Sequence, residues 1–176
     1  EAATRISRSG RAAFVATRLH KGATKRAVHA DAYHASADDF VERLAPADTL
    51  LLIGASDIAA ALARFAVSLG LRVVVIDGRE RYATRERFAS AQDVLVGMPS
   101  ELARPYLTAG AYVVLTTHDY KYELPILRDA LRAPVRFVGM LAGRKRADGI
   151  RTLLREDGLT DAEIERLHAP IGLDIG

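Results

Sequence analysis

Several short polar clusters in the sequence stand directly after runs of aliphatic residues. The first cluster follows the run at 49–54 and reads Gly54-Ala55-Ser56-Asp57 before a helical pattern of small residues. A tight glycine turn that opens a helix can hold the phosphates of a dinucleotide. Ser56 stands where such a turn usually has its middle glycine, and its hydroxyl can cap the helix or donate to a phosphate. Asp57 puts a carboxylate in the first helical turn, where it repels a pyrophosphate.

This first turn has two interpretations. It is either a nucleotide site or a packing joint between a strand and a helix, because the motif alone is weakly specific. The second aliphatic run ends in Asp77, twenty-three residues after Gly54. An acid at about this offset commonly accepts hydrogen bonds from a ribose. Asp77 also precedes Gly78, so an ordinary turn is the alternative.

A third polar cluster closes the run at 111–117. Thr116, Thr117, His118 and Asp119 place two hydroxyls, an imidazole and a carboxylate at one end of a predicted strand. These groups suit general acid–base chemistry or the binding of a polar heterocycle. The alternative is a helix start with Asp119 in its first turn and His118 exposed to solvent.

Two further groups lie near the C-terminal end of the sequence. Gly143 and Arg144 open a basic helical stretch, and positive charge there opposes the helix dipole unless an anion is bound. A solvated basic turn is the alternative. The segment 168–176, which contains Asp174, is apolar, and we expect it to fold back over the sheet. The cluster at 116–119 has no second histidine at metal-ligand spacing from His118, and we expect no metal held by this chain alone.

Alternating strands and helices must position these groups. The aliphatic runs lack polar alternation, as in strands buried on both faces of a parallel sheet: 49–54, 71–77, 93–98, 111–117 and 135–141. Helical patterns separate them at 57–69, 99–107, 120–132 and 144–156, and a Thr160–Glu163 capping box predicts one more helix. The pattern predicts an α/β fold, a doubly wound Rossmann-like parallel sheet of about five strands.

The first 48 residues form a separate basic segment in this interpretation. Stretches 11–19 and 23–33 predict a small β-hairpin around Gly22, and Ala-Pro-Ala-Asp at 45–48 marks a boundary. We therefore expect an N-terminal arm at 1–48 and a Rossmann-like domain at 49–176. Residues 1–30 carry seven Lys or Arg against one acid, which indicates either a phosphate-rich partner or a solvated edge.

Composition limits the class of protein. The chain of 176 residues is 49% hydrophobic and 27% charged, with a net charge of +3, which is typical of a globular protein. It has no cysteine, which excludes disulfides and thiolate sites within this chain. The sequence has no apolar run of membrane-spanning length and no signal-peptide pattern. We expect a cytoplasmic location and no membrane or nucleic-acid partner. We also expect this chain to be part of a longer protein.

The order and spacing of four stretches resemble one protein family. LLLIGASDIAAALARFAVSLGLRVVVIDGRERYATRERF, THDYKYELPIL, FVGMLAGRKRA and above all HAPIGLDIG are similar to the C-terminal Rossmann-like domain of the XdhC/CoxI xanthine dehydrogenase accessory proteins. The resemblance spans about residues 40–176. This chain departs from the family pattern at Ser56 and Asp57, where members usually have Gly and His, and at Gly78, where they usually have a second acid.

The resemblance implies a function. Such proteins bind the molybdenum cofactor, as molybdopterin or its dinucleotide, and assist its maturation and insertion into a molybdenum hydroxylase of the xanthine or carbon monoxide dehydrogenase type. It implies a non-catalytic cofactor chaperone, a cysteine desulfurase partner and a possible homodimer. The expected cofactor-binding residues are Gly54, Ala55, Ser56, Asp77, Thr117, His118, Asp119, Gly143, Arg144 and Asp174. The alternatives are an NAD(P)-dependent oxidoreductase, with His118 as proton donor, and a ligand-free protein interaction domain.

Overall fold

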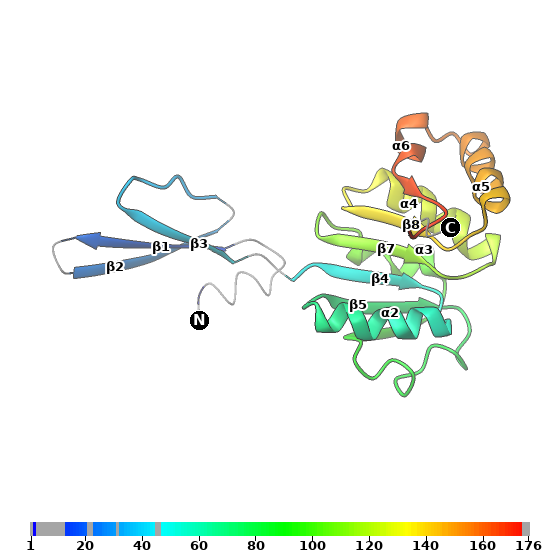
Figure 1. Cartoon of the computed structure of the whole chain (residues 1–176), viewed down its shortest axis with the longest axis horizontal. Coiled ribbons are helices and arrows are strands. Elements are labelled where there is room, and N and C mark those ends of the chain that lie inside the picture. The colour runs from blue at the N-terminus through cyan, green and yellow to red at the C-terminus, as the bar shows by residue number, and fades with distance from the viewer. Residues whose placement is uncertain (1, 3–12, 21–22, 31, 45–46, 174–176) are drawn as a thin grey trace. The chain divides into compact units, whose positions relative to one another are not determined.

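The chain divides into two compact units, Glu1–Ala47 and Asp48–Gly176. The computed structural model describes residues 2, 13–20, 23–30, 32–44 and 47–173. Each unit has its own sheet, shown in Figure 1.

The N-terminal unit contains a three-stranded antiparallel sheet in its described part. The strands are β1 (Ala13–His20), β2 (Ala23–Ala30) and β3 (Asp39–Leu44), in the order β2-β1-β3. The predicted hairpin is confirmed by the pairing of β1 with β2, while the turn that contains Gly22 lies outside the described residues. The third strand was not predicted from the sequence.

Asp39 explains how the third strand is fixed. Its carboxylate accepts hydrogen bonds from the Arg18 guanidinium, from the Tyr33 hydroxyl at 2.8 Å and from the Ser36 amide at 2.9 Å. The guanidinium and these hydrogen bonds hold the pKa of Asp39 well below its usual value. Asp39 therefore ties the start of β3 to β1, which the polar and poorly alternating sequence around it did not reveal.

The second unit contains a parallel sheet of six strands in the described residues, in the order β6-β5-β4-β7-β8-β9. They are β4 (Thr49–Ile53), β5 (Arg72–Asp77), β6 (Asp93–Val96), β7 (Ala111–Leu115), β8 (Phe137–Met140) and β9 (Leu167–His168). The first five correspond to the predicted strands. The sixth strand, β9, was not predicted, because its two residues form no aliphatic run.

The helices agree closely with the sequence pattern. They are α2 (Asp57–Ser68), α3 (Pro99–Leu102), α4 (Tyr120–Arg132), α5 (Arg144–Glu156) and α6 (Asp161–Glu165). The predicted helix at 99–107 is instead α3 followed by a 3-10 turn, Arg104–Tyr106, because Pro105 has no amide to continue an α-helix. The capping box at Thr160 and Glu163 is confirmed.

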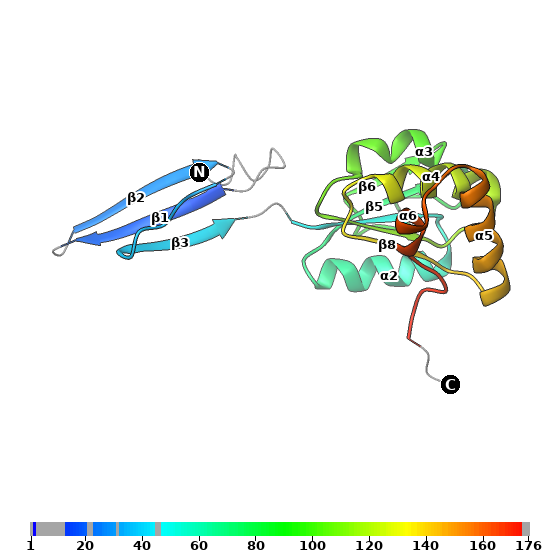
Figure 2. The ribbon, with the colours of Figure 1, turned by 90° about the horizontal axis from the view of Figure 1, so that it is seen from above.

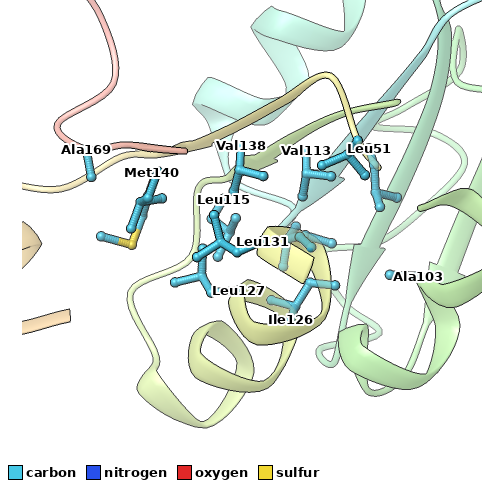
Figure 3. Close-up of a cluster of buried hydrophobic side chains, with 14 of the residues drawn as sticks. Leu51, Ala103, Val113, Leu115, Ile126, Leu127, Leu131, Val138, Met140 and Ala169 are labelled. Atoms are coloured by element: carbon cyan, nitrogen blue, oxygen red, sulfur yellow. The ribbon is translucent and has the colours of Figure 1, made fainter. Parts of the chain in front are cut away.

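Helices cover both faces of the sheet. Figure 2 shows α2 on one face and α3 and α4 on the other. Small residues let α2 lie close to the sheet, since Ala59, Ala63 and Ala66 are its buried positions. Figure 3 shows the core on the α4 side, where Ile126, Leu127 and Leu131 meet Val113, Leu115 and Val138. The predicted doubly wound fold is confirmed.

The chain order creates a switch point beside β4. From β4 the chain adds β5 and β6 on one side of β4, and it later adds β7 and β8 on the other. The crossover helices of adjacent strands β4 and β7 therefore leave to opposite faces, which opens a crevice beyond the carboxyl ends of the strands. In the part of the chain that the structure describes, every helix is too short or too polar to cross a membrane.

Candidate ligand-binding site

A cavity of about 480 Å³ lies at this switch point. Segments that follow β4, β5, β7 and β8 contribute to it, as expected for the carboxyl edge of an open parallel sheet. Five of the predicted cofactor-binding residues line it: Ala55, Ser56, Thr117, His118 and Asp119. Its other lining residues are Asp57, Ile58, Arg79, Tyr82, Arg87, Thr116, Tyr122 and Leu141.

Gly54 makes the tight turn that brings the two sides of the cavity together. Its φ of +101° lies in a region that residues with a side chain rarely adopt. A Cβ at this position would stand 2.8 Å from the amide nitrogen of Thr117. The Thr116 hydroxyl also donates to the Gly54 carbonyl oxygen at 2.9 Å. The predicted role of Gly54 in a tight turn is therefore confirmed, although Gly54 does not itself line the cavity.

The N-termini of α2 and α4 both reach the cavity. Ser56 is the N-cap of α2, and its hydroxyl oxygen accepts a hydrogen bond from the Ala59 amide at 3.1 Å. Asp119 is the N-cap of α4, and its carboxylate accepts from the Lys121 amide at 2.9 Å. Each side chain therefore satisfies one of the unpaired amides that begin a helix. The capping alternative left open for Ser56 is what this structure shows.

Asp77 is buried beside the turn, and both oxygens of its carboxylate accept hydrogen bonds from the protein. Oδ1 accepts from the amide and from Nε of Arg79, both at 2.9 Å. Oδ2 accepts from the Ala55 amide at 2.7 Å and from Nη2 of Arg79 at 2.8 Å. Burial raises the pKa of Asp77, but hydrogen bonds from Arg79 and Ala55 outweigh it, so the pKa lies below its usual value. The Asp77 carboxylate therefore links the end of β5 to the turn after β4.

Asp57 is held at the rim of the cavity by Arg87. Its carboxylate is fully exposed and lies 2.6 Å from Nη2 of Arg87. Nη1 of the same guanidinium donates to the carbonyl oxygens of Ala55 at 2.7 Å and Tyr82 at 3.0 Å. Arg87 therefore attaches the loop after β5 to the first turn and neutralises the acid that the sequence placed at the start of α2.

The side of the cavity beyond β7 is less occupied by the chain's own contacts. His118 and Asp119 are exposed in the lining, and Thr117 is buried beneath them. An imidazole, a hydroxyl and a carboxylate there can exchange hydrogen bonds with a polar heterocycle or its substituents. Leu141, directly after β8, adds an apolar wall.

Four polar or aromatic residues in the lining were missed from the sequence: Arg79, Tyr82, Arg87 and Tyr122. Arg79 packs over the Tyr82 ring with 4.4 Å from Cζ to the ring centroid. Two features of the sequence could have indicated the arginines. Asp57 places an acid at the N-terminus of a helix, where it needs a cation, and the stretch directly after Asp77 is rich in arginine. Tyr122 gave no signal beyond its place in the first turn of α4.

Gly143 and Arg144 lie outside the lining of the cavity. Gly143 is the N-cap of α5, and Arg144 is the first residue of that helix. The basic turn forms an ion pair within the protein: the Arg146 guanidinium lies 2.5 Å from a carboxylate oxygen of the fully buried Glu123. This ion pair accounts for part of the positive charge at the start of α5 without a bound ligand.

Asp174 lies outside the described residues. The segment before it does fold back, as expected, because the Ile171 amide donates to the Met140 carbonyl oxygen at 3.0 Å and Ile171 packs against the α2-side core. A second cavity of about 520 Å³ lies here, between Phe137, Arg151 and residues 167–173. Leu173 is 90% exposed. Within the described ranges, no group of three His, Asp or Glu side chains is placed to hold a metal ion.

Comparisons with known proteins agree with this architecture. The family model described as the XdhC Rossmann domain matches residues 50–176. A Bacillus subtilis (strain 168) protein, named as a probable xanthine dehydrogenase subunit, is 23% identical over 154 residues, 87% of this chain and 44% of that protein. The Escherichia coli (strain K12) protein YqeB, named as uncharacterized, is 30% identical over 129 residues, 72% of this chain and 24% of that protein.

A solved structure also shares the fold. The crystal structure of a xanthine dehydrogenase from Bacillus halodurans matches with a TM-score of 0.78 and 21% identity, over 99% of this chain and 56% of that one. This chain thus spans less than half of each curated relative and just over half of the solved one. Because the family match covers residues 50–176, the chain belongs to the XdhC family through its Rossmann domain.

Proposed function

We propose that this chain is the cofactor-binding part of an accessory protein that carries the molybdenum cofactor to a xanthine-dehydrogenase-type molybdenum hydroxylase. Family membership and the Bacillus subtilis relative, whose name links it to xanthine dehydrogenase, support the connection to such an enzyme. The observation that carries the binding role is the cavity at the switch point, where two helix N-termini meet exposed polar side chains.

The size and the polar lining of the cavity support a pterin ligand. Its volume of about 480 Å³ lies within the range of roughly 300–1,000 Å³ that small-ligand sites occupy. Thr117, His118 and Asp119 offer both donors and acceptors to a heterocycle. When bound, the cofactor would supply the dithiolene-held molybdenum that the client enzyme uses.

The chain's own residues would bind and orient the cofactor without chemical conversion. Thr117 and His118 would hold the polar ring, and Leu141 would shield one side of it from water. The turn at Gly54 and the Asp77–Arg79 ion pair would keep the opposite wall rigid. In this proposal the protein is a cofactor chaperone in the cytoplasm. The family resemblance supports a cysteine desulfurase and a second copy of the chain as further partners.

A direct titration tests the proposal. Purified chain is titrated with isolated molybdopterin under anaerobic conditions, and binding is followed by calorimetry and by the protection of the pterin from oxidation on exposure to air. We expect saturable binding at one site and slower oxidation of the bound pterin. Absence of both effects at concentrations of about 100 μM would refute the binding role.

One observation favours a protein interaction domain as a second candidate. Ile58 and Phe65 on α2 and Leu69 directly after it stand at helical spacing and are 54%, 70% and 79% exposed. Exposed apolar groups at helical spacing commonly mark a protein contact. A Phe65→Ser/Leu69→Ser variant should lose binding to the hydroxylase and keep its affinity for molybdopterin, if α2 contacts the client. Loss of hydroxylase binding in a chain that never binds molybdopterin would favour the interaction domain alone.

A further inference from the structure

We infer that two copies of this chain associate through the α2 side of the second unit, so that α2 of each copy covers β7 and β8 of the other. The proposed function names a second copy as a partner but assigns no surface to it. Two neighbouring features of this side point to the contact. They are an open area of the sheet and a row of exposed apolar side chains along α2.

The open area is the α2 side of β7 and β8, which has no helix over it in the part of the chain that the structure describes. Helix α2 packs on β4 and β5, and Figure 2 shows α3 and α4 on the opposite face of the sheet. Tyr112 of β7 and Phe137 of β8 lie on the α2 side and are only partly buried. A Cβ placed on Gly139 would stand 2.5 Å from Ile171 and 2.6 Å from Phe137, so both side chains close over this glycine. The floor of the open area is therefore apolar.

The apolar row along α2 borders the open area. It consists of Ile58, Leu62, Phe65 and Leu69, at steps of four, three and four residues. At about 100° per residue the row spans about 60° of the helix, roughly a quarter turn from the buried alanines that face the sheet. Because the helix and the β4–α2–β5 crossover are both right-handed, this flank of α2 faces β7 rather than β5. Leu62 is partly buried, whereas the other three side chains are exposed.

A ridge beside an open area makes this side complementary to itself. A two-fold axis parallel to the strands places α2 of one copy over β7 and β8 of the other, and the same rotation covers the open area of the first copy. The apolar rows of the two helices then contact each other at the centre. Ala61 and Ser68, on the outer side of α2, are small and let a second sheet approach the helix. Such an isologous contact closes after two copies.

The charges on this side suit a second copy. Asp57 and Arg64 are the only charged residues of α2, and Asp57 is paired with Arg87. A surface with so little charge is matched by an equally uncharged surface, because charged residues are depleted at the centres of protein interfaces. The net charge of +3 on the whole chain is small, so repulsion between two copies is weak.

The exposed area is also large enough for a dimer. With roughly 150–250 Å² for each large side chain, the exposed fractions of Ile58, Phe65 and Leu69 amount to about 300–500 Å² of apolar surface in one copy. Two such rows, with the two open areas that they cover, bring the buried total above the roughly 1,000 Å² that a specific interface needs.

Sedimentation velocity of the full chain without any ligand tests this contact. We expect a dimer at about 50 μM, and in Phe65→Ser/Leu69→Ser a dissociation constant at least about tenfold higher. The matched control is Phe40→Ser in β3 of the other unit, because Phe40 is 64% exposed against 70% for Phe65. It should leave the dimer unchanged. A wild type that stays monomeric at about 100 μM, or a dimer that the α2 variant leaves intact, would overturn the contact.

The two-fold arrangement can be checked by cross-linking, because the chain has no cysteine of its own. Phe65→Cys should form a disulfide between two copies on mild oxidation, since equal positions of the two helices meet across the axis. Phe40→Cys is the control and should form far fewer cross-links. Equal cross-linking of the two variants would contradict the arrangement.

Molybdopterin binding is measured separately, so that the two proposals can fail independently. A chain that dimerises through α2 but does not bind molybdopterin would refute the proposed function alone. A monomer that binds molybdopterin would refute only the contact between copies. A monomeric wild type in which Phe65→Ser/Leu69→Ser abolishes binding to the hydroxylase would assign the apolar row to the client enzyme instead.

Discussion

The two halves of the cavity differ in how much of their polar capacity the chain itself uses. On the β4–β5 side, Asp77 and Asp57 are each paired with an arginine from the loop that follows β5. On the β7 side, His118 and Asp119 face the cavity as exposed groups, and only the Asp119 carboxylate has a capping role. A polar group at a strand end is therefore available to a ligand only where no neighbouring loop provides its partner.

This difference separates two kinds of aspartate–arginine pair. The Asp77 carboxylate is 2% exposed and the Asp57 carboxylate is 100% exposed, although both lie within hydrogen-bonding distance of a guanidinium. Solvent screens an exposed pair, whereas removal of one partner from a buried pair leaves a desolvated charge. We therefore expect Asp77 to control the stability of the turn and Asp57 to influence only what binds there.

The largest effect should come from the residue that joins the two halves. Gly54→Val forces a side chain into a φ of +101° and into contact with the Thr117 amide, which should destabilise the fold by about 3 kcal/mol. Chemical denaturation measures the loss. Gly149→Ala is the control, because a Cβ there meets nothing within 4 Å and a helical alanine should stabilise the fold slightly. Equal stability of Gly54→Val and the wild type would show that the halves are not coupled through this turn.

The next effect concerns the buried pair. Asp77→Asn removes the charge that accepts four hydrogen bonds, and we expect a loss of about 2 kcal/mol in the free energy of unfolding at pH 7. Because the folded pKa of Asp77 lies below the unfolded value of about 3.9, its contribution is complete well above that value and is lost as the pH falls below it.

Denaturant titrations at several pH values check this sign. The stability difference between the wild type and Asp77→Asn should stay constant between about pH 6 and 8 and shrink below about pH 4. A difference that grew on acidification would contradict an ionised Asp77 in the folded state.

A smaller effect is expected on the open side. His118→Ala should weaken molybdopterin binding about tenfold by removing one ligand-facing hydrogen-bonding group, with an unchanged melting temperature. His34→Ala, an exposed histidine of the N-terminal unit, is the matched control. If both variants bound molybdopterin equally well, the β7 side would not be the ligand-binding half.

The smallest effect on stability should come from the exposed pair. Asp57→Asn removes a fully exposed carboxylate, so its melting temperature should match that of the wild type within error. Thermal unfolding of this variant beside Asp77→Asn compares the two pairs directly. A loss as large as that of Asp77→Asn would remove the distinction between them.

Much of the second unit could be predicted from local sequence patterns. The bounds of α4 and α5 were predicted to the residue, because each helix has a clear apolar face. The strands after Thr49 were predicted because continuous aliphatic runs specify strands buried on both faces. The two-residue β9 and the third strand of the first unit depend on pairing with distant segments, so no local pattern revealed them.

The candidate site was predicted where its chemistry is local. Gly54 and Ser56 act within their own turn, and both the tight turn and the helix cap could be foreseen from their residue types. Arg87 was missed because it meets Asp57 across thirty residues of sequence. Arg144 was predicted to belong to the site only because of its positive charge at the start of a helix. In the structure, Arg146 of the same basic turn forms an ion pair with the buried Glu123.

Hydrogen–deuterium exchange of the full chain with and without molybdopterin would show which side of the cavity binds the ligand. We expect ligand-dependent protection of the amides at 116–122, between β7 and the first turn of α4, with little change at 77–87. Protection confined to 77–87, or to the second cavity at 167–173, would contradict the assignment of the ligand to the open half.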